Sequence, residues 1–224
     1  MTPTKPMIAC GRAILFDMDG TLVDSSAVVA AQWQKFAHKY DLDADAVYEF
    51  SHGRTTMATI TKFAPHLTPG QQAAEVKAML EHELLLRDKV TEIPGARDFI
   101  AQLMDLRAPM ALVTSAPGPL ARARLRTVGV PVPATVIAAE NITHSKPDPE
   151  GYLKAAAALG VAPEETVVFE DAAAGIAAGE SAGAQVVIVG NTIPHKDTPH
   201  PRITDYRNLQ VRRSGDGTLN ITAT

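Results

Sequence analysis

Short apolar runs alternate with helix-period segments along most of the chain. Apolar runs suited to buried strands occupy residues 14–16, 109–114, 135–138, 166–169 and 185–189. Between them, the spacing of apolar residues predicts helices over residues 95–106, 119–128, 151–159 and 173–182. Strands that alternate with helices are typical of a parallel sheet covered on both faces. The predicted fold class is therefore α/β, with a doubly wound parallel sheet.

One region interrupts this alternation. Residues 26–89 are polar and rich in alanine, with helix-period stretches at 30–40 and 71–87 and no convincing strand. We interpret this block as a helical cap domain inserted after the first strand, over the carboxyl ends of the core strands. The expected domains are a core of residues 1–25 and 91–224 and a cap of residues 26–90, with hinges at 23–26 and about 90–95. Residues 210–213 and 218–221 flank the turn sequence SGDG, which predicts a terminal β-hairpin.

Composition and charge argue against several classes of function. The chain has 224 residues, of which 46% are hydrophobic and 21% charged, enough for one large domain or one domain with an insertion. The net charge of -4 argues against a generic nucleic-acid-binding protein. No stretch approaches the roughly 18 apolar residues of a membrane span, and the N-terminus lacks the apolar core of a signal peptide. We therefore expect a cytoplasmic protein with no membrane partner.

Single residues and loops add further expectations. The one cysteine, Cys10, rules out an internal disulfide framework and is expected to be a small buried side chain. No apolar stripe suggests a compulsory oligomer, so a monomer is expected. The loop from Asn191 onward, including residues 199–201, is expected to be a surface connection. Three glycines recur every four residues, which predicts close packing on one helix face: Gly175, Gly179 and Gly183. The sequence contains no GxGxxG motif, which argues against dinucleotide binding.

Two aspartates follow the first predicted strand. Residues 13–23 read AILFDMDGTLV, so Asp17 and Asp19 lie just beyond the apolar run, and Gly20 ends it. In open α/β sheets, ligands bind beyond the carboxyl ends of the strands. An aspartate is ionised at neutral pH and can attack phosphorus without a base to activate it. Neighbouring acidic groups also favour a divalent cation, and oxygen ligands favour Mg²⁺. An Asp-rich turn, or part of a calcium loop, is the alternative interpretation of this segment.

Three further polar groups follow predicted core strands. Thr114 and Ser115 are candidates for holding phosphate oxygens, although a hydroxyl at a strand end is common. Lys146 lies beside the stiffening prolines of HSKPDP, where it is either a fixed ammonium group or an ordinary surface lysine in a turn. Glu170 and Asp171 form a carboxylate pair, which is costly at the end of an apolar strand unless a cation or hydrogen-bond donors compensate.

In this order, the motifs resemble the four signature motifs of the haloacid dehalogenase superfamily of phosphohydrolases, over essentially the whole chain. The resemblance implies that Asp17 is a nucleophile that becomes an aspartyl phosphate, and that Asp19 is the general acid/base. It also implies that Thr114 and Lys146 bind the transferring phosphoryl group. The metal ligands that it implies for Mg²⁺ are Asp17, the main-chain carbonyl of Asp19, and Asp171, with Glu170 beside the ion or reaching it through water.

The inserted region resembles the small α-helical cap of the subgroup that includes β-phosphoglucomutase. Residues 51–56 (SHGRTT) and 168–179 are similar to the sugar and polyol phosphatases, such as 2-deoxyglucose-6-phosphatase and glycerol-1-phosphatase. The segment ARAR at residues 121–124 and the hairpin tail are most similar to the bacterial sugar phosphatases. The resemblance implies that His52, Gly53 and Arg54 lie on the cap face above the aspartates and bind substrate, the alternative being a solvated loop.

The resulting hypothesis is a Mg²⁺-dependent phosphatase that acts on small sugar or polyol phosphates. The phosphatases share the threonine at position 114, whereas the mutase branch more often has serine. The cap has no lysine nearer to Arg54 than Lys62, which weakens an interpretation as a phosphonoacetaldehyde hydrolase. Two alternatives stay open: a β-phosphoglucomutase-like isomerase, and a catalytically idle member that binds a ligand or partner. The identity of the substrate depends on cap side chains, which no spacing pattern determines.

Overall fold

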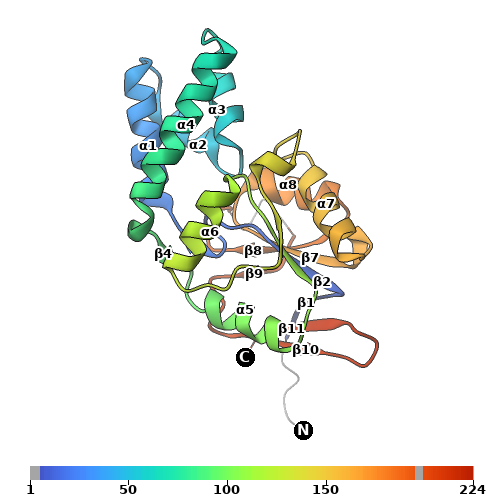
Figure 1. Cartoon of the computed structure of the whole chain (residues 1–224). Helices are drawn as coiled ribbons and strands as arrows, with labels where there is room; N and C mark the ends of the chain where they lie inside the picture. Colours follow the sequence, from blue (N-terminus) through green and yellow to red (C-terminus); the bar gives the residue numbers. More distant parts are fainter. Residues whose placement is uncertain (1–5, 195–198, 224) are drawn as a thin grey trace.

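A six-stranded parallel sheet forms the centre of the molecule (Figure 1). The computed structural model describes residues 6–194 and 199–223. The strand order is β6-β5-β2-β7-β8-β9, and every neighbouring pair is parallel. The strands are β2 (Ala13–Phe16), β5 (Met110–Val113), β6 (Thr135–Ile137), β7 (Thr166–Glu170), β8 (Gln185–Val189) and β9 (Arg202–Ile203). The five predicted core strands are confirmed, whereas the sequence pattern does not predict β9, a strand of two residues at the sheet edge.

Helices cover both faces of this sheet. The helices are α5 (Ala96–Asp105) and α6 (Gly118–Thr127) on one face, and α7 (Glu150–Leu159) and α8 (Ala173–Ser181) on the other. Ile14 and Phe16 of β2 belong to the apolar cluster that contains α5 and α6, whereas Leu15 belongs to the cluster that contains α7 and α8. Successive side chains of a strand point to opposite faces, so one short strand supplies both clusters. The doubly wound fold class predicted from the sequence is confirmed.

A second, antiparallel sheet joins the two ends of the described chain. Its strands are β1 (Met7–Gly11), β10 (Leu209–Arg213) and β11 (Leu219–Ala223), in the order β1-β11-β10. The predicted terminal hairpin is confirmed, and β1 is a strand that the sequence pattern does not predict. The expectation that Cys10 is buried is wrong, because Ala9 and Gly11 occupy the inward positions of β1 and leave Cys10 half-buried on the other side.

Four helices are inserted between β3 (Val23–Asp24) and β4 (Thr91–Glu92). They are α1 (Ser26–Lys39), α2 (Ala44–Ser51), α3 (Thr56–Phe63) and α4 (Pro69–Leu85), and the 3-10 helix η1 (Arg87–Lys89) follows them. The helices pack around an apolar cluster of their own, which includes Trp33, Phe36 and Ile60. As predicted, residues 26–89, all of which the structure describes, contain no strand. We call these four helices the insertion.

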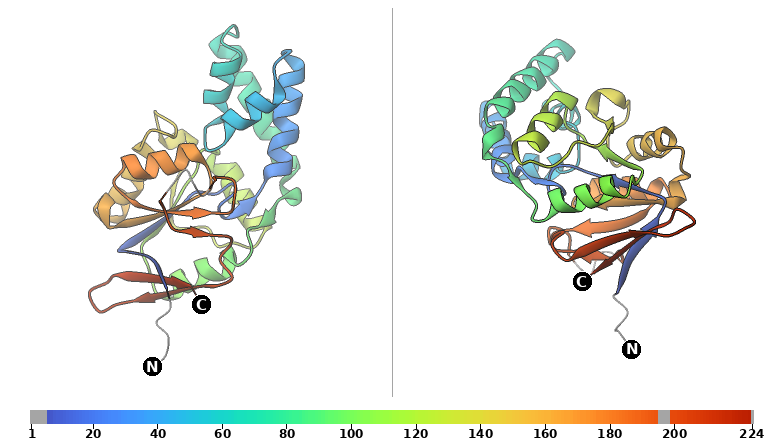
Figure 2. Two further views of the ribbon diagram at one scale, coloured as in Figure 1. Left: turned by 180° about the vertical axis from the view of Figure 1, so that it is seen from behind. Right: turned by 60° about the horizontal axis from the view of Figure 1, so that its bottom comes forward.

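The insertion is connected to the core by two chain segments that run side by side. Val23 pairs with Glu92 and Asp24 pairs with Thr91 in an antiparallel ribbon, at the positions where the sequence predicts hinges. Figures 1 and 2 show the insertion beside α6, and α4 and η1 both contact that helix. The predicted domain boundaries stay a prediction, with the cap at residues 26–90 and the core at residues 1–25 and 91–224. Movement of the cap against the core also stays a prediction. Residues 1–5 and 224 of the predicted core lie outside the described residues.

Capping side chains explain where the helices of the insertion begin. The Asp43 side chain accepts hydrogen bonds from two backbone N–H groups at the start of α2. Thr55 accepts one from Ala58 at the start of α3, and Thr68 forms a capping box with Gln71 at the start of α4. Such caps satisfy N–H groups that the helix itself cannot pair. The Thr55 cap therefore fixes the point where the segment between α2 and α3 ends.

The remaining segments bear on three expectations from the sequence. Gly175 and Gly179 lie in α8 as predicted, but the prediction for Gly183 is wrong: it follows the helix end, has a φ of +84° and donates to Glu180. Part of the predicted surface loop, residues 195–198, lies outside the described residues. The short helices η2 (Ala139–Asn141) and η3 (Pro163–Glu165) complete the chain. Within the described ranges, no helix combines the length and apolar character needed to cross a membrane.

Candidate active site

The turn after β2 holds Asp17 and Asp19 at the carboxyl edge of the sheet. Asp17 donates its N–H to the Phe169 carbonyl at 3.0 Å, and its side chain is buried. Gly20 has a φ of +82°, and a Cβ atom there would overlap the carboxylate of Asp171. Glycine adopts this left-handed conformation without steric cost. The turn therefore brings the two segments that carry Asp17 and Asp171 into direct contact.

Lys146 lies at the centre of the buried charges. Its ammonium group donates to Asp17 Oδ1 and to Glu170 Oε1, both at 2.6 Å, and to the Val113 carbonyl at 3.1 Å. An ammonium group has three donors, so this set pairs all of them. Burial alone would lower the pKa of Lys146, but the adjacent Asp17 and Glu170 outweigh it and the pKa is raised. Lys146 is therefore a buried cation and not a surface lysine in a turn.

Glu170 is completely buried and accepts hydrogen bonds at both oxygens. Oε1 accepts from Lys146 and from the Tyr152 hydroxyl at 2.7 Å, and Oε2 accepts from the backbone N–H groups of Asp171 and Ala172. A Cβ at Gly175 would overlap this carboxylate, which accounts for one of the predicted α8 glycines. Glu170 thus provides the countercharge for Lys146, and its oxygens already have protein partners.

The acidic side chains carry more negative charge than Lys146 alone balances. Burial raises the pKa of Asp17 to about 8, against the opposing effect of Lys146, and Glu170 adds to the increase. Burial also raises the pKa of Asp171 well above its usual value, and Asp17 and Glu170 contribute in the same direction. Carboxylate oxygens of Asp17, Glu170 and Asp171 lie within 4.8 Å of one another. Clustered hard oxygen ligands with uncompensated charge fit a divalent cation such as Mg²⁺.

Thr114 and Ser115 follow β5 on the other side of Asp17. Thr114 is buried, its N–H donates to the Ile137 carbonyl, and its Oγ1 accepts the N–H of Ala116 at 3.1 Å. The Ser115 hydroxyl instead donates to the carbonyl of Gly53 in the insertion, at 2.7 Å. The two adjacent hydroxyls therefore differ in their partners: Thr114 bonds within its own loop, and Ser115 bonds to the insertion.

The segment between α2 and α3 brings His52, Gly53 and Arg54 to the same site. Gly53 has a φ of +73°, and a Cβ there would lie 3.1 Å from the Cβ of Ala172, so the insertion approaches the core closely at this point. Arg54 donates to the Phe50 carbonyl at 2.9 Å, and its guanidinium carbon lies 4.2 Å from the Phe50 ring centroid. A ring nitrogen of His52 lies 3.2 Å from the Glu49 carbonyl. All three residues are partly buried, so this segment is not a fully solvated loop.

A cavity of about 320 Å³ lies between the core and the insertion. Asp17, Asp19, Thr114, Ser115 and Asp171 line it from the core. The insertion contributes His52, Gly53 and Arg54, together with an apolar wall that includes Val29 and Trp33. Two of the site residues predicted from the sequence, Lys146 and Glu170, do not line this cavity. They contact residues that do, because Lys146 donates to Asp17 and Glu170 accepts the N–H of Asp171.

Sequence reasoning missed the ion pairs that connect Asp19 to Arg124 and Arg124 to Glu83. Arg124 of α6 donates to Asp19 Oδ1 at 2.7 Å and to Glu83 of α4 at 2.6 Å. Arg124 is only 2% exposed, and burial raises the pKa of Glu83 against the opposing effect of Arg124. One signal was present in the sequence: Arg124 lies three residues after Ala121 and beside Leu125, on the apolar face of its helix, where a charged residue needs a partner.

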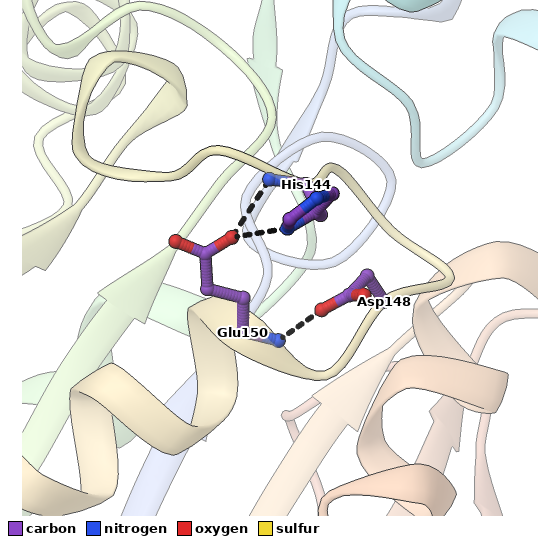
Figure 3. A group of neighbouring side chains, drawn as sticks. All are labelled: His144, Asp148 and Glu150. Carbon is purple, nitrogen blue, oxygen red and sulfur yellow. Dashed lines mark hydrogen bonds and ion pairs between the residues drawn. The ribbon is translucent and has the colours of Figure 1, made fainter.

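A second group of potential metal ligands lies in the loop that carries Lys146 (Figure 3). His144, Asp148 and Glu150 offer ligand atoms within 4.8 Å of one another. Figure 3 shows that Glu150 accepts the backbone N–H of His144 and lies 3.3 Å from a ring nitrogen of the same residue, and that Asp148 accepts the Glu150 N–H. Lys154 also pairs with Glu150 at 2.6 Å. These contacts tie the loop to the start of α7, and we interpret the group as a structural clamp for that loop.

This fold and this arrangement of charges agree with a family comparison. The chain belongs to the haloacid dehalogenase-like hydrolases, whose family model matches residues 12–183. The match includes the turn with Asp17 and Asp19, the whole insertion, and the loops that carry Lys146 and Asp171. The family predicted from the sequence is confirmed.

Relatives within this family are phosphatases. The chain is 37% identical to hexitol phosphatase A from Escherichia coli (strain K12) over 178 residues, which cover 80% of this chain and 82% of the relative. It is 35% identical to glycerol-1-phosphate phosphohydrolase 2 from Saccharomyces cerevisiae, over 84% of this chain and 78% of the relative. The fold is similar to that of a β-phosphoglucomutase from Clostridium difficile, with a TM-score of 0.78 over 89% of this chain and 93% of that chain at 23% identity. The class of enzyme predicted from the sequence, a phosphatase, is confirmed by these names.

Proposed function

We propose that the protein is a Mg²⁺-dependent phosphatase that hydrolyses small sugar or polyol phosphates through an aspartyl phosphate on Asp17. The observation that carries this proposal is the buried contact of Asp17 with Lys146 beside a cavity that Asp19 also lines. A carboxylate held by a cation at the floor of such a cavity suits attack on a phosphate ester. The relatives named as phosphatases of hexitol phosphates and of glycerol 1-phosphate support this class of substrate.

The reaction proceeds in two steps. In the first, a carboxylate oxygen of Asp17 attacks phosphorus, the bond from phosphorus to the ester oxygen breaks, and Asp19 donates a proton to the departing alcohol. In the second, Asp19 takes a proton from water, the water oxygen attacks the aspartyl phosphate, and inorganic phosphate leaves. Asp17 and Asp19 return to their starting states, so the cycle consumes one water and needs no other reactant.

The other residues at the floor of the site hold charge and position. Lys146 and Thr114 bind the transferring phosphoryl group in this proposal, Lys146 by giving up one of its three hydrogen bonds. The Ser115 hydroxyl is available if its bond to Gly53 opens. Asp17, Asp171 and the main-chain carbonyl of Asp19 would hold Mg²⁺, with Glu170 beside it because both Glu170 oxygens accept protein hydrogen bonds. When bound, a magnesium ion neutralises negative charge on the phosphoryl oxygens.

The insertion supplies specificity in this proposal. The cavity of about 320 Å³ lies at the small end of the ~300–1,000 Å³ range of ligand sites, which favours a small monoester over a large one. His52 and Arg54 line the same cavity as the two aspartates and suit contacts with substrate hydroxyls. We infer that residues 26–90 act as a cap that closes over the substrate by bending at the ribbon of β3 and β4, which would exclude bulk water from the reaction.

The test is phosphate release from a panel of sugar, polyol and nucleoside monophosphates, with Mg²⁺ or with EDTA. We expect metal-dependent release from several small sugar or polyol phosphates, and no release by Asp17→Asn. Release by Asp17→Asn equal to that of the wild type would overturn the assignment of the nucleophile. Conversion of glucose 1-phosphate into another phosphate ester without free phosphate would identify a mutase instead, and no reaction with any substrate would identify an idle member.

A further inference from the structure

Arg124 is a buried cation at the contact between the insertion and the core. It belongs to α6, and its two partners belong to other parts of the molecule: Asp19 to the turn after β2, and Glu83 to α4 of the insertion. Helices α4 and α6 contact each other, and Figure 1 shows them side by side. We call these three side chains the Arg124 bridge. It is the one ion-pair network among the described residues that joins the insertion to the core.

The energetics of this arrangement need an explanation beyond packing. Ala121 and Leu125 are the neighbours of Arg124 on the buried face of α6. An apolar side chain of similar volume would pack there without the desolvation cost of a guanidinium group. The arginine is tolerated because two carboxylates accept its hydrogen bonds, and each of these carboxylates lines the cavity. The bridge therefore has its two ends at the candidate active site.

The bridge determines how Asp19 is oriented. Asp19 Oδ1 accepts hydrogen bonds from Arg124 Nη1 and from the Ser25 hydroxyl, both at 2.7 Å. Among the described residues no hydrogen bond reaches Oδ2, and the Asp19 side chain is 30% exposed beside the cavity. Two donors on one oxygen restrict rotation of the carboxylate. Oδ2 is then the oxygen that is available to exchange a proton with the substrate.

We propose that Arg124 is a positioning residue, which holds Asp19 in the orientation for proton transfer while Glu83 makes that orientation depend on the seating of the insertion. This inference rests on the proposed function, because it takes Asp19 as the general acid/base. Glu83 lies on the insertion, so a displaced insertion removes one of the two carboxylates that hold the guanidinium. Arg124 is then free to rotate, and Asp19 loses one of its two anchors. Proton transfer is thereby favoured when the insertion is seated on the core.

The test compares two esters that differ in their need for a general acid. An alkyl phosphate such as glycerol 1-phosphate needs a proton on its leaving oxygen, whereas p-nitrophenyl phosphate releases a stable anion and needs little help. Because kcat/KM reports the first step alone, to which general acid catalysis contributes ~10²–10⁴-fold, we expect Arg124→Met to lower kcat/KM for the alkyl ester by ~10–100-fold and for p-nitrophenyl phosphate by less than ~3-fold. kcat should fall for both esters where the second step limits turnover, because in that step Asp19 takes a proton from water whichever ester was the substrate.

Matched variants separate positioning from structure. Glu83→Gln should show the same selectivity for the alkyl ester with a smaller loss, and Arg124→Lys should retain part of the activity that Arg124→Met loses. Arg122→Met, an exposed arginine in the same helix, should leave both esters unchanged. Added guanidinium ion should restore alkyl ester hydrolysis to Arg124→Ala but not to Asp19→Ala. If Arg124→Met does not fold, as judged by its melting curve, Glu83→Gln and the rescue of Arg124→Ala decide the question.

The outcomes also separate this inference from the proposed function. Equal losses of kcat/KM on both esters in the Arg124 and Glu83 variants, or no loss on either, would overturn the positioning role while wild-type hydrolysis would still support a phosphatase. A wild-type protein that releases phosphate from neither ester would overturn both. Selective loss in Asp19→Ala without selective loss in the Arg124 variants would retain Asp19 as the general acid and reject the Arg124 bridge as its positioning element.

Discussion

The two buried cations of the site can be compared directly. Lys146 lies between Asp17 and Glu170, and Arg124 lies between Asp19 and Glu83. All partners of Lys146 belong to the core, and its third donor is bound by a core carbonyl. The partners of Arg124 come from the core and from the insertion. The first cation thus maintains an arrangement within one structural unit, whereas the second responds to the contact between two units.

This difference indicates a division of roles between the two aspartates. Asp17 is held by a cation whose hydrogen-bond partners all belong to the core, which suits a nucleophile that must be in place before substrate arrives. Asp19 is held by a group that the insertion does touch, which suits proton transfer that is needed only after closure. The predictions below test this contrast, beginning with the largest expected effect.

Removal of Lys146 should have the largest effect. Lys146→Met leaves Asp17 and Glu170 buried without their cation, so we expect the free energy of unfolding to fall by ~3–5 kcal/mol. Phosphate release should fall by ~10²–10³-fold on alkyl and p-nitrophenyl esters alike, because a charge that stabilises the phosphoryl group is lost. Urea unfolding and steady-state kinetics measure the two effects.

Lys77→Met is the control for that substitution. Lys77 lies on the exposed face of α4, 3.9 Å from Glu81, where an ion pair contributes little. We expect a change in unfolding free energy of less than ~0.5 kcal/mol and unchanged kinetics. A Lys146→Met protein that hydrolyses p-nitrophenyl phosphate normally would show that the two buried cations do not differ as proposed.

Magnesium should stabilise the folded protein by binding at the carboxylates of Asp17 and Asp171. A ligand that binds only the folded state at 100 times its Kd stabilises it by ~2.7 kcal/mol, so the melting temperature should rise with added MgCl₂. Asp171→Asn should lose most of this gain, because Asp171 is a proposed ligand. Glu150→Gln, in the exposed group of Figure 3, should keep the full gain. Equal stabilisation of the Asp171→Asn and wild-type proteins would exclude the proposed metal site.

Gly53→Ala should disturb the insertion and leave the contacts of Lys146 with Asp17 and Glu170 intact. The alanine would adopt a φ of +73° with its Cβ 3.1 Å from Ala172, at a cost of ~1–2 kcal/mol. We expect KM for sugar phosphates to rise by up to the ~5–30-fold that such an energy represents, with kcat on p-nitrophenyl phosphate close to that of the wild type. Gly70→Ala in α4, where a Cβ meets nothing within 4 Å, is the matched control. An equal rise in KM for Gly70→Ala would remove the special role of position 53.

The smallest expected effect concerns the loop that carries Lys146. Hydrogen bonds from Lys154 and from the backbone of Thr143 and His144 lower the pKa of Glu150 from 4.5 to about 2. The clamp should therefore hold fully above pH 4.5 and be lost as the pH falls through 2. An NMR titration of the Glu150 carboxyl measures this, and Lys154→Met should raise the pKa toward 4.5. A wild-type value of 4.5 would show that the clamp is absent in solution.

Much of the fold could be predicted from the sequence, for identifiable reasons. Most of the core strands are apolar runs bounded by turn residues, the pattern that burial of a strand on both faces favours. Four strands escaped prediction: β3, β4 and β9 have two residues each, and β1 is an edge strand in which part of the residues face away from the core. The prediction for Gly183 failed because spacing alone does not reveal where a helix ends, and here the end is set by the left-handed conformation of that residue.

The candidate site was predictable in its core and not at its contact with the insertion. Four site residues lie just beyond core strands or in the loop after one, so the parallel sheet brings them to one edge: Asp17, Thr114, Lys146 and Asp171. Glu83 and Arg124 follow no core strand, and an acidic or basic residue in a helix usually faces solvent, so the place of Arg124 on the apolar face of α6 was the one indication. Arg124 is 105 residues from Asp19 and 41 from Glu83 along the chain.

The sequence by itself determined the parallel core, the inserted helices and the chemical groups at the carboxyl edge of the sheet. It did so because strand period, helix period and strand ends are local properties, readable within a few residues. Only the tertiary structure decided that Ser115 bonds to Gly53, that Glu170 serves Lys146, and that Arg124 joins Asp19 to the insertion. These contacts depend on how α4 and the segment between α2 and α3 pack against the core, and no local pattern encodes the packing of surfaces that are distant in sequence.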